Sequence, residues 1–298
     1  MQIAIVGDPA GGYVQRLAAA ATELGHTPHV IAFDQFDLGV SGGRPRTGSE
    51  VCDPEQLDAV VVRTMPPGTL EQVVWRMDLL AGLEAQGLAI VNSPKALECA
   101  VDKALTTQRL ALARIPVPDT IVCESFERAM AAWSELGRDV LVKPLFGSEG
   151  RGIVRICEEE IAVRVLRTLT RMGSVLYLQR CLDTTGGDLR LLLLDGQLLG
   201  AIRRIPGAGE FRANLACAGT AIAYEPTDAE RELAVRAAEV TQSVFAGVDL
   251  MYDDDGQPLV IEVNAVPGWK GLQQACRVNV AEVFLRWLEI RVSAGARK

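Results

Sequence analysis

The sequence predicts a fold of class α/β (α+β), in which a parallel α/β domain precedes two α+β subdomains. Short β-branched runs alternate with helical segments over the first 97 residues, and this alternation is typical of a parallel sheet. From residue 98 onward, strands, helices and glycine-rich turns follow one another, and the α+β class of these subdomains is what a family resemblance described below implies. The 298 residues are enough for two or three subdomains.

Residues 1–97 are predicted to form the parallel sheet. Residues 39–56 are rich in glycine, proline and arginine and are expected to form a loop. The glycine turn at 7–12 lacks the G-x-G-x-x-G spacing, so we interpret it as a strand-to-helix turn and not as a dinucleotide site. Strands are expected at 3–6, 30–33, 59–63 and 88–91, with helices at 13–24 and 70–85.

Residues 98–180 are predicted to contain a glycine-rich connection between two strands. A helix that holds Asp102 and Lys103 opens this region, and a strand at 140–143 precedes the connection at 146–154. Unlike a Walker loop, this connection has no Gly-Lys-Ser/Thr sequence after it. It could be an ordinary hairpin turn, or a flap whose backbone N–H groups approach a triphosphate. Lys143, directly before it on a strand, favours the flap.

Residues 181–298 are predicted to contain two alternating strands, a basic segment and an acidic hairpin. The strands at 191–194 and 198–203 lead into the basic segment at 203–215. Thr227 and Glu230 have the spacing of a capping box and predict a helix over 228–244. A final helix is expected from about residue 280.

Composition and charge exclude several classes of protein. The net charge of −8 argues against a surface for nucleic acid, and no apolar run approaches the ~18 residues that cross a membrane. Seven scattered cysteines without a C-x-x-C pair suit buried thiols in a reducing cytosol. The chain begins with a strand-like run, so no secretory signal is expected. We therefore expect a cytoplasmic globular protein.

The hairpin around Asp255 and Gly256 carries the most informative residues. If these two residues form the turn, Asp249 lies directly opposite Glu262, and Asn264 shares their face of the sheet. Two ionised carboxylates at this spacing repel each other and destabilise the hairpin. A hard divalent cation, which takes oxygen ligands, would bind both and make their proximity favourable. The sequence therefore favours a magnesium site. The alternative is a solvated sheet face with an acidic turn.

Taken together, these motifs resemble the ATP-grasp superfamily, and within it the RimK-like carboxylate–amine ligases that add glutamate to an acceptor. The similarity is strongest in the segments 203–214, 246–249 and 261–268, it covers about residues 98–290, and the first region matches only in layout. The resemblance implies an ATP-grasp fold with a pre-ATP-grasp domain at 1–97. It also implies a central subdomain with a glycine-rich flap at 98–180 and a C-terminal subdomain with the metal site at 181–298.

The resemblance also implies roles for individual residues. Gln179 falls at the hinge position that contacts adenine, where an acid is usual, and Asp188 falls near the ribose. Departures at Cys217-Ala218-Gly219 put one phosphate or acceptor contact in question. ATP would be bound by Lys103, Lys143, Gly147, Ser148, Glu149, Gly150, Gly152, Gln179 and Asp188; catalysis would fall to Arg203, Arg212 and Asn214, and the metal to Asp249, Glu262 and Asn264.

The activity that the resemblance implies is amide formation through an acyl phosphate, with ATP, two Mg²⁺ ions (or Mn²⁺) and no protein nucleophile. L-Glutamate is the expected amino acid, and a pterin-type one-carbon coenzyme is the first expectation for the acceptor. A homo-oligomer is expected, without nucleic acid or membrane as partner. A glutathione-synthetase-like ligase and a catalytically inactive nucleotide-binding regulatory protein remain as alternatives.

Overall fold

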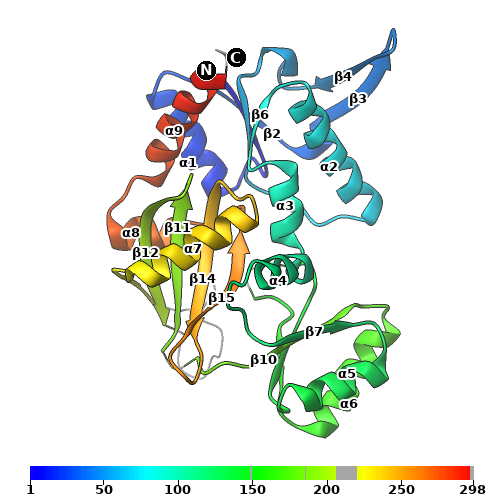
Figure 1. The fold of residues 1–298 in the computed structure, drawn as a ribbon. Helices are drawn as coiled ribbons and strands as arrows, with labels where there is room; N and C mark the ends of the chain where they lie inside the picture. The colour runs from blue at the N-terminus through cyan, green and yellow to red at the C-terminus, as the bar shows by residue number, and fades with distance from the viewer. Residues whose placement is uncertain (148–149, 185, 206–219, 296–298) are drawn as a thin grey trace.

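The computed structural model describes residues 1–147, 150–184, 186–205 and 220–295. Within these ranges the strands form a parallel sheet, two antiparallel sheets and a separate two-stranded hairpin. Each of the three larger sheets is drawn from one of the three predicted regions of the chain (Figure 1). No helix in the described ranges is long and apolar enough to cross a lipid bilayer.

The parallel sheet of the first region has the strand order β2-β1-β5-β6. Its side chains alternate between two faces, so that Ile3 and Ile5 pack with helix α1 while Ala4 and Val6 pack with helix α2. The predicted strands and helices of this region are confirmed, except that the strand expected at 30–33 runs from Thr27 to Ile31 and Phe33 begins a 3-10 turn. Their bounds are β1 (Gln2–Val6), α1 (Gly12–Glu23), β2 (Thr27–Ile31), β5 (Ala59–Val62), α2 (Leu70–Ala85) and β6 (Ala89–Val91), with 3-10 turns at Phe33–Gln35 and Pro54–Gln56.

The prediction of a loop at 39–56 is wrong for most of that segment. Strands β3 (Phe36–Ser41) and β4 (Arg44–Ser49) form a hairpin that projects from the first domain at the upper right of Figure 1. Gly42 and Gly43 both have positive φ, as a two-residue hairpin turn requires. Most of these strand residues are exposed, so the hydrophobic alternation that marks a half-buried strand is missing from the sequence.

The central subdomain has an antiparallel sheet of order β7-β10-β8-β9, whose core side chains pack against helices α5 and α6. It is connected to the first region through two short helices rather than the single helix predicted. Asp102 ends the first helix and caps the second, because its Oδ1 accepts from the backbone N–H groups of Ala104 and Leu105. The bounds are α3 (Pro94–Val101), α4 (Lys103–Leu112), β7 (Thr120–Cys123), α5 (Phe126–Glu135), β8 (Val140–Lys143), β9 (Val154–Ile156), α6 (Glu159–Arg171) and β10 (Leu176–Arg180).

The C-terminal sheet has the order β13-β12-β11-β14-β15 and is covered on one face by helix α7. The predicted capping box starts this helix, since Thr227 and Glu230 bond each other's backbone N–H groups. Helix α9 packs against α1 of the first domain. The bounds are β11 (Asp188–Leu194), β12 (Gln197–Ile205), β13 (Thr220–Ala223), α7 (Asp228–Val240), β14 (Phe245–Tyr252), β15 (Pro258–Asn264), α8 (Lys270–Cys276) and α9 (Val280–Gly295).

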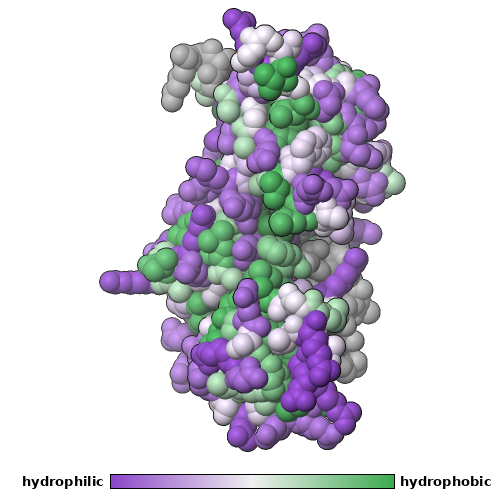
Figure 2. Space-filling view, turned by 90° about the vertical axis from the view of Figure 1, so that its right-hand side faces the viewer, coloured by the Kyte–Doolittle hydropathy of each residue, from purple (hydrophilic) through white to green (hydrophobic). Residues whose placement is uncertain are grey.

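The two faces of the C-terminal sheet have different surroundings. Leu189, Leu191 and Leu193 of β11 point toward α7, so the intervening residues of the strand point the other way. On that other face, Leu192 and Leu194 pack against the first domain and α9. The remaining end of the face, toward the start of β11, is polar and borders the site described below. The outer surface seen in Figure 2 mixes polar and apolar residues, with the apolar ones gathered along its middle.

Candidate functional site

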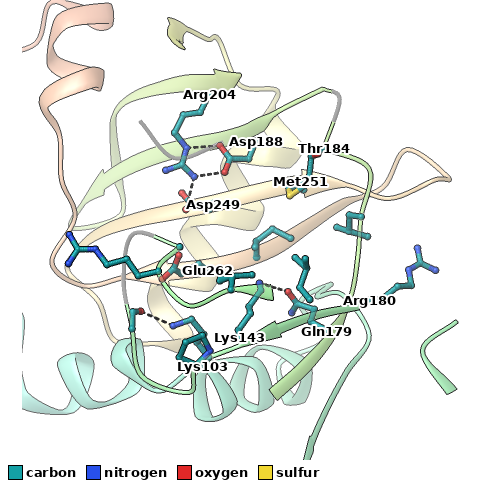
Figure 3. A pocket seen from close by; sticks show the side chains of 18 of the residues that line it. Lys103, Lys143, Gln179, Arg180, Thr184, Asp188, Arg204, Asp249, Met251 and Glu262 are labelled. Atoms are coloured by element: carbon teal, nitrogen blue, oxygen red, sulfur yellow. Dashed lines mark hydrogen bonds and ion pairs between the residues drawn. The ribbon is translucent and has the colours of Figure 1, made fainter. Parts of the chain in front are cut away.

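A cleft that is open to solvent lies between the central sheet and the C-terminal sheet. One wall is made by β8, β10 and the glycine-rich connection, and the other by β11, β12, β14 and β15 (Figure 3). Charged and polar side chains from both walls point into it. Its lining includes Lys103, Lys143, Gly147, Gly150, Gln179, Arg180, Asp188, Arg204, Asp249, Met251 and Glu262.

The acidic pair, Asp249 and Glu262, lies on the C-terminal wall of this cleft. The two residues are direct partners across strands β14 and β15, which is the register the sequence predicts. Asp249 is buried, whereas Glu262 is half-buried. Asn264 pairs with Gly247 two positions along the strand, but it is not among the residues that line the cleft.

The route to this register differs from the prediction. The turn contains three residues rather than two, because the Asp253 N–H donates to the Gln257 carbonyl at 3.0 Å. Gly256, at φ +75°, occupies the left-handed position that such a turn requires. One extra residue in β15, Ile261, then forms a bulge that restores the pairing of the acidic pair. Two local changes therefore cancel, and the predicted pairing is correct for a different reason.

Asp249 is neutralised by two arginines from neighbouring strands. Arg190 donates from Nε to Asp249 Oδ1 and from Nη2 to Oδ2, both at 2.6 Å, and Arg204 Nη2 donates to Oδ2 at 2.8 Å. Burial alone would raise the pKa of Asp249, but the charges and hydrogen bonds of the two arginines outweigh burial and lower this pKa. Asp249 is therefore a carboxylate at neutral pH.

Arg204 also holds Asp188 at the start of β11, where Nε and Nη2 of the arginine bond both carboxylate oxygens at 2.5 Å. This approach depends on Gly187, which has φ +71°. A Cβ atom at that position would lie 2.1 Å from the Arg204 carbonyl oxygen. Asp188 thus lines the cleft, as expected of a residue near the ribose, but its carboxylate is engaged by an arginine.

The oxygens of this wall can accept a divalent cation. Among the described residues, Glu262 has no hydrogen-bond or ion-pair partner, so both of its oxygens are available. Asp249 Oδ1 accepts a single hydrogen bond and keeps a second lone pair. Within the described part of the chain, Asn264 Oδ1 likewise accepts only from the Val266 N–H, at 2.8 Å. Two carboxylates and an amide are hard oxygen donors of the kind Mg²⁺ prefers.

Two lysines face the acidic pair from the central subdomain. Lys143 is buried on β8 and donates to Gln179 Oε1 at 2.6 Å, while Lys103, at the start of α4, donates to the Gly147 carbonyl at 2.7 Å. Burial lowers the pKa of Lys143 to about 8, although the charge of Glu262 opposes this shift. Burial also lowers the pKa of Lys103, again against the charge of Glu262. Both lysines would gain from an anionic ligand between the walls.

Gln179 lies on β10 at the floor of the cleft and is fully engaged. Its Oε1 accepts from Lys143, and its Nε2 donates to Thr120 Oγ1 at 3.0 Å and to the Tyr177 hydroxyl at 3.1 Å. An acid at this position would pair with Lys143 and could not donate to these two hydroxyls. The glutamine therefore leaves Lys143 without a carboxylate partner on its own wall.

Arg203, predicted as a catalytic residue, does not line the cleft. It pairs with Leu189 and therefore points toward the α7 face, where its guanidinium lies 4.9 Å from the Tyr224 ring centroid. The neighbouring Arg204 occupies the cleft face instead. Sequence reasoning missed both Arg204 and Arg190. Counting alternation from Leu189 and Leu191, which flank it, would have placed Arg190 on the face opposite those two leucines.

The predicted residues Ser148, Glu149, Arg212 and Asn214 lie outside the described residues. Among the predicted glycines of the connection, Gly147 and Gly150 line the cleft, while Gly152 packs against Pro144. The structure thus brings together Lys103, Lys143, Gly147, Gly150, Gln179, Asp188, Asp249 and Glu262.

Comparisons with known proteins identify the family of the chain. A model of the RimK-like ATP-grasp domain matches residues 100–288. A tetrahydromethanopterin:alpha-L-glutamate ligase of Methanosarcina acetivorans is 30% identical, with 95% of this chain and 97% of the relative covered. A probable alpha-L-glutamate ligase of Xanthomonas oryzae is 32% identical, with 99% and 100% covered.

Solved structures show the same fold. The ATP-grasp ligase PsnB, complexed with a variant of its minimal precursor, Mg and ADP, has a TM-score of 0.76 at 21% identity, covering 97% of this chain and 98% of the other. A RimK domain protein from Sphaerobacter thermophilus has a TM-score of 0.74 at 23% identity, covering 96% and 98%. The chain is an ATP-grasp ligase, an enzyme that forms C–N bonds, and it belongs to the RimK-like ATP-grasp family.

Proposed function

We propose that this enzyme joins L-glutamate to a carboxylate acceptor through an acyl phosphate. The observation that carries the proposal is the arrangement of the cleft, in which two lysines on one wall face an acidic pair on the other. The lysines supply positive charge for phosphate groups, and the carboxylates supply oxygens for a divalent cation. This combination suits a nucleoside triphosphate bound between the two sheets.

The roles of the residues follow from their positions. Lys103 and Lys143 would bind the phosphates, and Asp249 and Glu262, with Asn264 beside them, would hold Mg²⁺. The ion, when bound, neutralises charge that develops on the phosphates. Arg190 and Arg204 keep Asp249 ionised and fixed in place.

The chemistry needs no protein nucleophile. The acceptor carboxylate attacks the γ-phosphoryl group, and ADP leaves. The amine of the amino acid then attacks the acyl phosphate, loses a proton and displaces phosphate, which leaves an amide bond. Positioning and charge neutralisation supply most of the acceleration in this type of reaction.

L-Glutamate and a pterin-type acceptor are the substrates that the relatives support best. One relative is named a tetrahydromethanopterin:alpha-L-glutamate ligase, and others are named probable alpha-L-glutamate ligases. The identities are about 30%, so the acceptor is the part of the proposal that most needs a direct test.

The test is to incubate purified protein with ATP and Mg²⁺ and to vary the amino acid and the acceptor. Tetrahydromethanopterin, folate-type pterins and short glutamyl peptides form the acceptor panel, and ADP release and product mass are the readouts. We expect ADP only when L-glutamate and one acceptor are both present, with a mass gain of one or more glutamyl residues. Binding of ATP without ADP release for any pair would support a regulatory protein instead.

The metal assignment has a local test in Glu262→Gln. Removing one of two carboxylates facing a divalent ion should lower kcat by at least ~10²-fold, because the ion loses a charged ligand while the fold keeps an isosteric side chain. Steady-state kinetics over a range of Mg²⁺ concentrations measures this loss. Glu135→Gln, in an exposed ion pair with Arg128, is the control and should keep wild-type kinetics. Full activity of Glu262→Gln would show that the metal lies elsewhere.

A further inference from the structure

Arg63 is a buried cation without a carboxylate partner. It directly follows β5 in the first domain and is only 5% exposed. Its Nη2 donates to the Pro267 carbonyl at 2.8 Å, and its guanidinium carbon lies 4.5 Å from the centroid of the Trp269 ring and 5.5 Å from that of Tyr13. Burial lowers the pKa of Arg63 to about 9, so the group stays charged at neutral pH.

Two donors in this cluster have no acceptor among the residues that the structure describes. Arg63 Nε and Trp269 Nε1 are both buried, and neither has a hydrogen-bond partner within 1–147, 150–184, 186–205 and 220–295. The Tyr13 hydroxyl nearby accepts from the Lys270 N–H. By contrast, the buried Arg204 has two carboxylates. A buried donor that is left unpaired costs free energy, and a charged donor costs more. Because one of these two donors belongs to a guanidinium, an anionic acceptor would satisfy both.

The topology of the parallel sheet places this cluster where ligands bind in such sheets. From β1 the chain crosses to β2 over the α1 face, and from β5 it crosses to β6 over the α2 face. The loops that leave β1 and β5 therefore diverge between adjacent strands. A crevice opens at the carboxyl ends of parallel strands at such a switch point, and it is the usual ligand site in open α/β sheets.

The cluster is also continuous with the metal wall of the cleft. Pro267, Gly268 and Trp269 come three to five residues after Asn264, the last residue of β15. Gly268 allows close contact with the first domain, because a Cβ atom there would lie 2.7 Å from the Tyr13 hydroxyl. A substrate held at the switch point would thus lie beside the strand that carries Glu262.

We propose that Arg63 Nε and Trp269 Nε1 bind a carboxylate of one of the two substrates, at an end of that substrate which does not react. The ligand chemistry is a carboxylate, supplied either by the acceptor or by the amino acid. This inference rests on the proposed ligase activity for its place in the reaction, but the binding site itself can be tested without turnover.

The test combines equilibrium titration and kinetics in Arg63→Met and Trp269→Phe. L-Glutamate and each acceptor of the panel are titrated separately by isothermal titration calorimetry, which gives Kd for the wild type and for both variants. For one of the two substrates, we expect Arg63→Met to raise Kd and KM about 10- to 100-fold, the loss typical of a charged hydrogen bond. The Kd of ATP should stay unchanged. The substrate affected identifies which carboxylate is bound.

Arg76→Met is the matched control, because Arg76 is also buried, lies over an aromatic ring and donates to a carbonyl, that of Pro66. It should leave both Kd values near wild type. Equal losses in Arg63→Met and Arg76→Met, or unchanged Kd values for both substrates in Arg63→Met and in Trp269→Phe, would overturn the proposal. Arg63→Lys, which keeps the charge, covers the case in which Arg63→Met does not fold, and should lose affinity partially. If the wild type releases no ADP with any pair, the ligase proposal fails while the titrations still decide this site.

Discussion

Asp249 has a charge balance that depends on side chains from three strands. Its own strand supplies the carboxylate, and β11 and β12 supply Arg190 and Arg204. With Asp188 included, two carboxylates and two guanidiniums form a cluster without net charge. The opposing carboxylates of the hairpin therefore do not require a metal ion for folding, and the electrostatic argument for a cation applies to Glu262 alone.

Asp249→Asn should destabilise the protein by about 3–5 kcal/mol, because the half-buried Arg190 loses its carboxylate partner and the buried Arg204 keeps only Asp188. Urea unfolding followed by circular dichroism measures the loss. The pKa of Asp249 is lowered in the folded state, so its contribution is fully present above the unfolded value of about 3.9 and is lost as the pH falls through the lower folded value. The difference from wild type should be constant from pH 5 to 8 and shrink below about pH 4. A difference that grew in acid would contradict the assignment.

Lys143 should make ATP binding sensitive to alkaline pH. Its pKa of about 8 in the free protein lies below the usual value for lysine, so the group loses its charge as the pH rises through 8. We expect the Kd of ATP to rise above pH ~8, by up to about tenfold per pH unit. Lys143→Arg keeps its charge and should remove this dependence if it still binds ATP. Fluorescence titration with a non-hydrolysable ATP analogue between pH 6.5 and 9.5 measures the effect.

At the scale of elements, the C-terminal hairpin and the start of β11 position the site. The three-residue turn and the bulge at Ile261 together keep the acidic pair in register. Gly187 lets β11 approach β12 closely enough for Asp188 to reach Arg204. The bulge at Ile261 and the left-handed Gly187 both depart from regular strand geometry, and both lie next to residues of the cleft. This agrees with the frequent occurrence of bulges and left-handed glycines beside functional sites.

Gly187→Ala should cost clearly more stability than the left-handed backbone alone explains. An alanine at positive φ costs about 1–2 kcal/mol, and a Cβ atom at this position would also clash with the Arg204 carbonyl. Gly173→Ala is the matched control, since its φ of +73° is nearly the same and nothing lies within 4 Å of its Cβ position. Urea unfolding should show a larger loss for Gly187→Ala by at least ~1 kcal/mol. Equal losses would mean that β11 can move away freely.

At the scale of the whole molecule, the first and last regions share one core, whereas the central subdomain has its own. The cluster around Ile3, Ile5 and α1 includes Phe245, Trp269 and residues of α9. Asn92, after β6, adds four hydrogen bonds to this interface. Its Nδ2 donates to the carbonyls of Phe245 and Ala265, and its Oδ1 accepts from the N–H groups of Val244 and Phe245. The walls of the cleft thus belong to two separately packed bodies.

Asn92→Ala should destabilise the first and C-terminal domains together, by about 3 kcal/mol or more, because buried backbone groups lose their partners. Hydrogen exchange with mass spectrometry should show faster exchange in β1, β5, β14 and β15, with little change in β8 and β10. Asn279→Ala, at an exposed helix start, is the control. Acceleration confined to β6 would show that the domains unfold independently.

The two lysines of the cleft were expected from the resemblance to ATP-grasp ligases, and the predicted pairing of Asp249 with Glu262 is correct only because a bulge offsets the longer turn. The sequence by itself determined the class of fold and most helix and strand positions. These features depend on periodicity, turn residues and capping over short distances, which neighbouring residues encode directly. Only the tertiary structure decided which arginine faces the cleft, how Asp249 is neutralised and that Arg63 lies against Trp269. Those contacts join residues 45 to 206 positions apart, and their geometry is set by the packing of whole sheets, which no local pattern records.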